Sequence, residues 1–190
     1  MTFFIRLTHN QLFSLLFIAP PLVAFLSISL IDPSIAFIYI FPCLIIFYFL
    51  VLFGWLYSTG VHLHAKLPQS VQLNHKRFEL LLLVAFGYIL FKCIDVFDIF
   101  KNATSDEAQA ISLLPNISSL PFLLFNPFHL VAMSCVFYCI YFNAKSLKAV
   151  ELQRAVQFKD FSNEFLLMWF FPIGIWFIQP RLNTIISNKA

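Results

Sequence analysis

Charged residues stand inside an otherwise apolar stretch between residues 78 and 100. Lys92 and Asp95 are three residues apart, and Asp98 and Lys101 repeat that spacing. Residues three apart share a helix face, so each pair can form an ion pair. A charged side chain in hydrocarbon costs several kcal/mol unless it pairs or reaches water. We therefore predict either paired charges at a helix end, or an ion or proton pathway or an interhelical polar anchor.

A histidine begins the next apolar stretch. His129 would enter the membrane from the same side as Asp95 and Asp98, so a contact between its imidazole and a carboxylate is one interpretation. A single interfacial histidine at a helix start is the alternative. The residues Lys92, Asp95, Asp98 and His129 are together our candidate intramembrane polar site.

Two adjacent prolines, Pro20 and Pro21, lie near the middle of the first apolar stretch. Proline has no backbone N–H and its ring clashes with the preceding turn, so the sequence predicts a kink that frees the carbonyls of Leu16 and Phe17. In lipid such carbonyls need another donor or water. The kink is either packed against neighbouring helices or part of a broken helix that forms a binding or permeation site.

The most polar segment is the connection from Ser58 to Arg77. It contains no acidic residue. Its three histidines and three cations are the candidate basic face: His62, His64, Lys66, His75, Lys76 and Arg77. This pattern is typical of a solvated basic turn or of a face that contacts anionic lipid headgroups or an acidic partner. The H-x-H pair has no carboxylate and no fixed ligand spacing beside it, so we expect no metal site.

Composition indicates that most of the surface lies in lipid. The 190 residues are 61% hydrophobic and 11% charged, against roughly 45–50% and about 25% in soluble domains. A net charge of +3 is too small to predict nucleic-acid binding. A spanning helix needs about 20 apolar residues. We expect one all-α integral membrane domain over residues 1–190, a bundle of four transmembrane helices at about residues 11–31, 34–57, 78–100 and 127–143, with a fifth short hydrophobic segment at 165–178.

Three local features refine these spans. We expect the first span to be retained, because no small-residue cleavage site follows closely. Trp55 and Tyr57 end the second span, where amphipathic rings prefer the membrane interface. After the fourth span, the helix is expected to continue out of the membrane through residues 144–158, since no strong breaker interrupts it.

The fifth segment, residues 165–178, is short for a span and has Pro172 and Gly174 at its centre. We favour a re-entrant or interfacial segment, and a fifth span is the alternative. Charge asymmetry predicts a cytoplasmic N-terminus, because eight cations then lie in cytoplasmic segments and Lys101 alone in an opposite one. A re-entrant segment also keeps Arg181 on the cytoplasmic side.

Two segments resemble those of a known family. They are G-W-L-Y-S-T-G-V-H-L-H-A-K-L-P at residues 54–68 and F-F-P-I-G-I-W-F-I-Q-P-R-L-N at residues 170–183. Both resemble segments of a family of small multi-span membrane proteins from Bacteroidota-type bacteria that has no assigned activity, and the closing motif is the more specific. The resemblance implies a bacterial inner (plasma) membrane location and four or five spans. It supplies no catalytic residues.

Enzyme signatures are missing from the sequence. It contains no H-E-x-x-H, no G-x-S-x-G and no Gly-rich phosphate loop, and only four glycines occur. The four cysteines, Cys43, Cys93, Cys135 and Cys139, all fall in expected spans and form no C-x-x-C pair, so we expect them to pack as small apolar side chains. We therefore expect no enzyme, no catalytic residues, no metal and no cofactor.

Two function classes remain. We favour a non-enzymatic membrane component, an accessory, scaffold or regulatory subunit that contacts the lipid bilayer or a membrane protein partner. The alternative is an oligomeric pore, channel or small transporter, including a membrane effector in a defence system, which uses the charged residues of the third span. Four spans are few for an internal pathway, so conduction would require a homo-oligomer.

Overall fold

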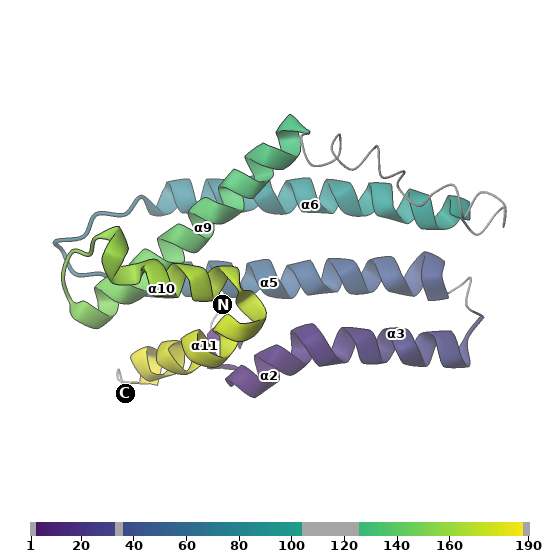
Figure 1. The fold of residues 1–190 in the computed structure, drawn as a ribbon, viewed down its shortest axis with the longest axis horizontal. Coiled ribbons are helices and arrows are strands. Elements are labelled where there is room, and N and C mark those ends of the chain that lie inside the picture. Colours follow the sequence, from purple (N-terminus) through teal and green to yellow (C-terminus); the bar gives the residue numbers. More distant parts are fainter. Residues whose placement is uncertain (1–2, 33–35, 104–125, 188–190) are drawn as a thin grey trace.

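The chain is helical throughout the part that the computed structural model describes, residues 3–32, 36–103 and 126–187, without the side chains of residues 37, 38, 96 and 98–103. No strand occurs in these ranges, which confirms the all-α class for them. The helices are α1 (Phe3–Arg6), α2 (His9–Phe13), η1 (Ser14–Ile18), α3 (Ala19–Leu30), η2 (Ala36–Ile40), α5 (Phe41–His64), α6 (His75–Ala103), α9 (Pro127–Leu152), α10 (Phe158–Trp169) and α11 (Phe171–Ser187). Figure 1 shows α3, α5 and α6 running roughly parallel to one another, with α9 crossing α6 and with α10 and α11 at one end.

Three helices are long and apolar enough to cross a membrane. They are His9–Leu30, Phe41–His64 and Pro127–Leu152, which overlap the first and second expected spans and contain the fourth. The third expected span lies in α6, which is 29 residues long but is not among the three. A bundle of four transmembrane helices therefore requires that α6 also crosses the membrane.

The first of these helices changes its hydrogen-bond pattern just before its prolines. The stretch η1 is a π-helix, in which the N–H of Ala19 donates to the carbonyl of Ser14, five residues back. Pro20 and Pro21 cannot donate to the α-helical ladder, and one wider turn accommodates them. The interruption expected at the prolines thus takes the form of a π-helical turn directly before them.

The helix α5 continues seven residues beyond the expected end of the second span. Ser58, Thr59, Gly60 and Leu63 are buried, so this polar-looking segment packs against other helices and does not form a loop in water. The connection between α5 and α6 is correspondingly short, residues 65–74.

The fourth helix continues beyond Asn143 as expected, but not through all of residues 144–158. It ends at Leu152, and Gln153 has φ 51°, a left-handed conformation that commonly ends helices. A new helix, α10, begins at Phe158. Its start is capped because the side chains of Gln157 and Asp160 bond to each other's backbone N–H groups.

The fifth hydrophobic segment, residues 165–178, is divided between two helices that form a hairpin. The helix α10 ends at Trp169, and α11 begins at Phe171 after a turn at Phe170. Gly174 allows the two helices to approach closely, because a Cβ there would overlap the carbonyl group of Leu167. Figure 1 shows α11 returning toward the end of the molecule at which α10 begins.

Candidate functional site

The Lys92–Asp95 ion pair that the spacing predicted is present. Nζ of Lys92 lies 2.6 Å from Oδ2 of Asp95, and the two side chains are 42% and 44% exposed. The ammonium group also lies 5.7 Å from the centre of the Phe91 ring. The pair therefore sits on the outer surface of α6. The side chain of Asp98, the third charge of the candidate site, lies outside the described residues.

His129 contacts a tyrosine and not Asp95. Its Nδ1 lies 3.3 Å from the hydroxyl of Tyr88, which connects the start of α9 to α6. Asp95 is about two helical turns beyond Tyr88 along α6 and is already paired with Lys92. The structure thus does not join His129 to the Lys92–Asp95 pair.

The six residues of the basic connection separate into different environments. The ammonium group of Lys66 donates to the carbonyl of Ile185 in the last turn of α11, where a cation complements the helix dipole. Nε2 of His75 lies 3.3 Å from Oε1 of Glu79. An acidic partner therefore comes from α6 itself. Lys76 is exposed.

The histidines pack and bond locally. The rings of His64 and His75 stack with their centres 4.7 Å apart, and Nε2 of His64 lies 3.2 Å from the carbonyl of Leu73. Nδ1 of His62 lies 2.8 Å from the carbonyl of Ser58. Among the described residues, no group of three or more His, Cys, Asp or Glu side chains is placed to hold a metal ion.

A buried polar network that the sequence analysis did not identify joins the two ends of the chain. Nε1 of Trp55 donates to Oε1 of Gln179 over 2.7 Å. Nε2 of Gln179 donates to the carbonyl of Leu7 over 2.7 Å and lies 3.2 Å from those of Phe4 and Ile5. Trp55 was expected at the membrane interface, but it is fully buried because α11 packs over it.

Four charged side chains form a second cluster where α9, α10 and α11 meet. We call Lys148, Glu151, Glu164 and Arg181 the ion cluster. Nζ of Lys148 and Nη2 of Arg181 donate to Oε1 of Glu164 over 2.9 and 2.8 Å. Nε of Arg181 also donates to Oε1 of Glu151 over 2.6 Å. The cluster fixes the base of the hairpin to the end of α9.

Contacts within the ion cluster favour the charged forms of Glu164 and Arg181. The side chain of Glu164 is 5% exposed, and burial alone raises its pKa. Hydrogen bonds from Arg181 and Lys148 outweigh that effect, so the pKa of Glu164 lies below its ordinary value of 4.5. The hydrogen bond to Glu151 raises the pKa of Arg181 despite burial. Each charge has an opposite partner, which favours a structural role over proton transfer.

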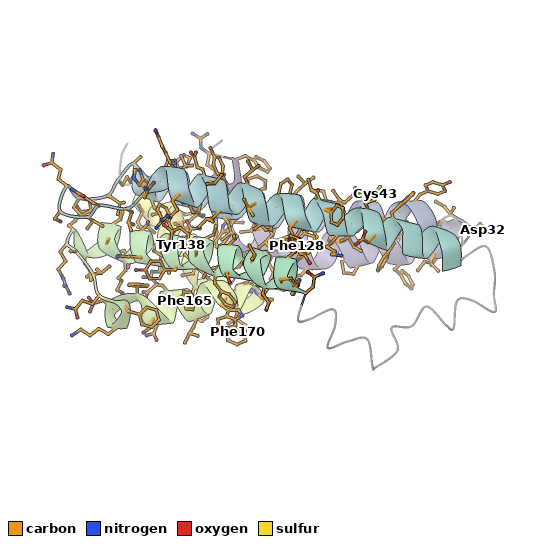
Figure 2. All side chains as sticks on the ribbon, turned by 90° about the horizontal axis from the view of Figure 1, so that it is seen from above. Asp32, Cys43, Phe128, Tyr138, Phe165 and Phe170 are labelled. Carbon is orange, nitrogen blue, oxygen red and sulfur yellow. The ribbon has the colours of Figure 1, made fainter. Side chains whose placement is uncertain are left out.

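The turn of the hairpin exposes large apolar side chains. Those exposed around it are Trp169, Phe170, Ile173, Trp176 and Phe177, and Figure 2 shows Phe170 at the edge of the molecule. Phe171 points inward, with its ring centre 5.0 Å from that of Trp55 and 6.3 Å from that of Phe17. The hairpin therefore has an apolar tip and a charged base.

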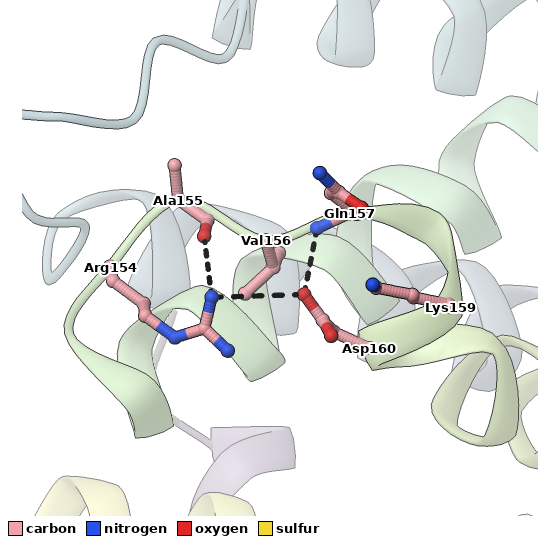
Figure 3. Close-up of a pocket in the computed structure, with 6 residues that line it drawn as sticks. All are labelled: Arg154, Ala155, Val156, Gln157, Lys159 and Asp160. Carbon is pink, nitrogen blue, oxygen red and sulfur yellow. Dashed lines mark hydrogen bonds and ion pairs between the residues drawn. The ribbon is translucent and has the colours of Figure 1, made fainter.

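A surface pocket of about 320 Å³ lies in the turn between α9 and α10, lined by Arg154, Ala155, Val156, Gln157, Lys159 and Asp160 (Figure 3). The carboxylate of Asp160 accepts a 2.9 Å hydrogen bond from the backbone N–H of Gln157 and lies 3.9 Å from Nη1 of Arg154. An acidic group thus occupies the helix start, where an anion would otherwise bind. We assign no ligand to this pocket.

Comparisons of the chain with protein-family models, with curated proteins and with solved structures found no match. The function is therefore inferred from the geometry. The buried polar side chains described above join helices to one another, and the half-exposed Lys92–Asp95 pair lies on an outer face.

Proposed function

We propose that this chain is a non-enzymatic multi-pass membrane component, an accessory, scaffold or regulatory subunit that contacts lipid and membrane protein partners. Its bundle consists of the three long apolar helices together with α6. The observation that supports this most is the α10–α11 hairpin, because an exposed apolar tip and a charge-paired base suit a segment inserted into a bilayer from one side.

The dimensions of the hairpin support a re-entrant path. The helices α10 and α11 have 12 and 17 residues, about 18 and 26 Å at 1.5 Å per residue. Each is shorter than the roughly 30 Å hydrocarbon core. Phe171 at the tip packs against Trp55, nine residues from the end of α5 at His64, or about 14 Å along that helix. The tip thus reaches at most about halfway across.

The hairpin enters from the cytoplasmic side. Its base lies at the end of the bundle that also holds the connection at residues 65–74 and the turn after Leu152 (Figure 1). These two segments and their flanks hold most of the cations outside the apolar helices, and cations concentrate in cytoplasmic segments. The resemblance of residues 170–183 to a bacterial membrane family makes the bacterial inner membrane the proposed location.

A second candidate is an oligomeric pore or channel. It is favoured by the exposed Lys92–Asp95 pair on α6 and by Gly87 on the same helix, where a Cβ would meet no atom within 4 Å. Polar and small residues on a lipid-exposed helix are typical of helix–helix contacts in membranes. A second copy of the chain on this face would place the charges at a subunit boundary.

A flux assay separates the two candidates. The purified protein is reconstituted in liposomes that contain a pH-sensitive dye, and a potassium or proton gradient is applied. A non-conducting component gives the same flux as liposomes without protein. A flux that the wild type shows and the Lys92→Met, Asp95→Asn double variant lacks would contradict the proposal and support the pore.

A further inference from the structure

Among the described residues, one cation on α6 and one on α9 have no carboxylate partner. Arg77 belongs to the first turn of α6, and Lys145 belongs to α9. In the described part of the chain, Lys148 and Arg181 form ion pairs, whereas Arg77 and Lys145 form none. These two positive charges are therefore available to an anion from outside the chain.

Two tyrosine side chains lie on α9 about one and two turns before Lys145. Nζ of Lys145 donates to the hydroxyl of Tyr141 over 3.3 Å, and the ring centres of Tyr141 and Tyr138 are 6.4 Å apart. Arg77 directly precedes Phe78, whose ring stacks on that of Phe142 in α9 with the ring centres 4.4 Å apart, so the start of α6 lies against this part of α9. Figure 2 shows Tyr138 between the ribbons of α6 and α9. We call the site lined by Arg77, Tyr138, Tyr141 and Lys145 the α6–α9 crease.

Acidic groups on the helices around the crease have other partners, and Glu151 on α9 pairs with Arg181. Glu79 accepts a hydrogen bond from the Tyr57 hydroxyl over 3.2 Å and pairs with His75. Asp160, on the helix that contributes Phe161 to the Tyr141 ring contact, pairs with Arg154. Within the described ranges, the positive charge of the crease is therefore uncompensated.

The crease changes from charged to apolar along the bundle. On α9, residues spaced by three and four share one face, and this face holds Val131, Ser134, Tyr138, Tyr141 and Lys145. Val131 is 56% exposed. On α6, Val84 lies seven residues, about two turns, beyond Arg77 and is also exposed. A charged end, then hydroxyls, then exposed apolar side chains is the polarity order of a phospholipid.

We propose that the α6–α9 crease binds an anionic phospholipid. Arg77 and Lys145 contact the phosphate oxygens, the hydroxyls of Tyr138 and Tyr141 donate hydrogen bonds to them, and an acyl chain lies along the apolar part of the face past Val131. Basic pockets between helices on the cytoplasmic side commonly bind such headgroups. This site goes beyond the proposed function and needs only that α9 crosses the bilayer, so its failure leaves that function in place.

Native mass spectrometry of the full chain in detergent tests the site. The protein is titrated with phosphatidylglycerol, with phosphatidylcholine of the same acyl chains, and with inorganic phosphate. We expect phosphatidylglycerol to bind more tightly than the other two. The Arg77→Gln, Lys145→Gln double variant should lose affinity for it by about fivefold per cation removed. The matched control Lys76→Gln, Lys159→Gln removes two exposed charges elsewhere and should bind like the wild type.

Three outcomes would overturn the proposal. Equal losses in both double variants would show attraction to net charge alone, and equal binding of phosphatidylcholine would show a site for acyl chains alone. Equally tight binding of inorganic phosphate would show a site for free anions. Tyr141→Phe keeps the ring and its packing but removes one donor, so a smaller, phosphatidylglycerol-specific loss is expected. That variant keeps the test decisive even where the charge variants unfold.

Discussion

The indole of Trp55 and the side-chain amide of Gln179, 124 residues apart in the chain, are joined by a 2.7 Å hydrogen bond. Gln179 also donates to the carbonyl of Leu7, so one buried side chain connects α5, α11 and the segment after α1. The C-terminal hairpin is therefore part of the core of the protein and not an appended segment.

Replacement of Gln179 by leucine should destabilise the protein by about 1–3 kcal/mol, because the buried N–H of Trp55 and the carbonyl of Leu7 lose their partner. Thermal unfolding in detergent, followed by circular dichroism, measures the change. Gln72→Leu is the matched control, since Gln72 is exposed and its replacement should leave the midpoint nearly unchanged. Equal midpoints for both variants would show that the network contributes little.

Acidification should loosen the hairpin through Glu164. The pKa of Glu164 in the folded protein lies below its ordinary value of 4.5, so its contribution to stability is fully present above that value. The contribution is lost as the pH falls through the lowered folded pKa. Thermal midpoints of the wild type should therefore fall more steeply than those of Glu164→Gln as the pH drops below 4.5. Parallel curves for the two proteins would contradict this.

Gly174 and Gly87 should respond oppositely to alanine. Gly174→Ala forces a Cβ against the backbone of Leu167 and should cost about 1–3 kcal/mol, as overpacking does. Gly87→Ala meets no atom within 4 Å and should be neutral or stabilise by up to about 1 kcal/mol through helix propensity. Chemical denaturation of both variants in the same detergent measures the difference. Equal free energies of unfolding for the two variants would show that the close contact at Gly174 contributes little to stability.

The Lys92–Asp95 pair should show strong coupling. Either single neutralisation leaves one charge without its partner on an apolar helix face. Such an unpaired charge costs several kcal/mol when it lies in hydrocarbon. The Lys92→Met, Asp95→Asn double variant removes both charges, so its loss of stability should be smaller than the sum of the single losses. The free energies of unfolding of the wild type, the two single variants and the double variant in nanodiscs form a double-mutant cycle that measures the coupling. Additive losses would mean that both side chains reach water independently.

The class of the protein could be predicted because lipid exposure requires a composition that few soluble domains have. Three of the expected spans correspond to helices long and apolar enough to cross a membrane. The continuation of α5 through Ser58 and Thr59 was missed, because polar side chains suggested a loop although tertiary packing buries them. The Lys92–Asp95 pair was predictable because its partners lie three residues apart.

The partners of Trp55 and Glu164 could not be predicted in the same way. Trp55 bonds to Gln179 from the far end of the chain, and no local spacing indicates such a contact. Glu164 meets Lys148 and Arg181 because α10 turns back along α9, and this turn depends on the left-handed conformation of Gln153. One signal was available, namely Gln179 and Arg181 within the otherwise apolar closing motif.

The sidedness of the two hairpin ends tests the re-entrant path of α10 and α11 most directly. The four cysteines are replaced, and single cysteines are introduced by Ala155→Cys, before α10, and by Ser187→Cys, at the end of α11. Gln72→Cys in the connection at residues 65–74 marks the cytoplasmic side. A membrane-impermeant maleimide is applied to right-side-out and inverted vesicles. The proposed function predicts that all three positions are labelled in inverted vesicles only, whereas labelling of Ser187→Cys from the opposite side would show that the segment crosses the membrane.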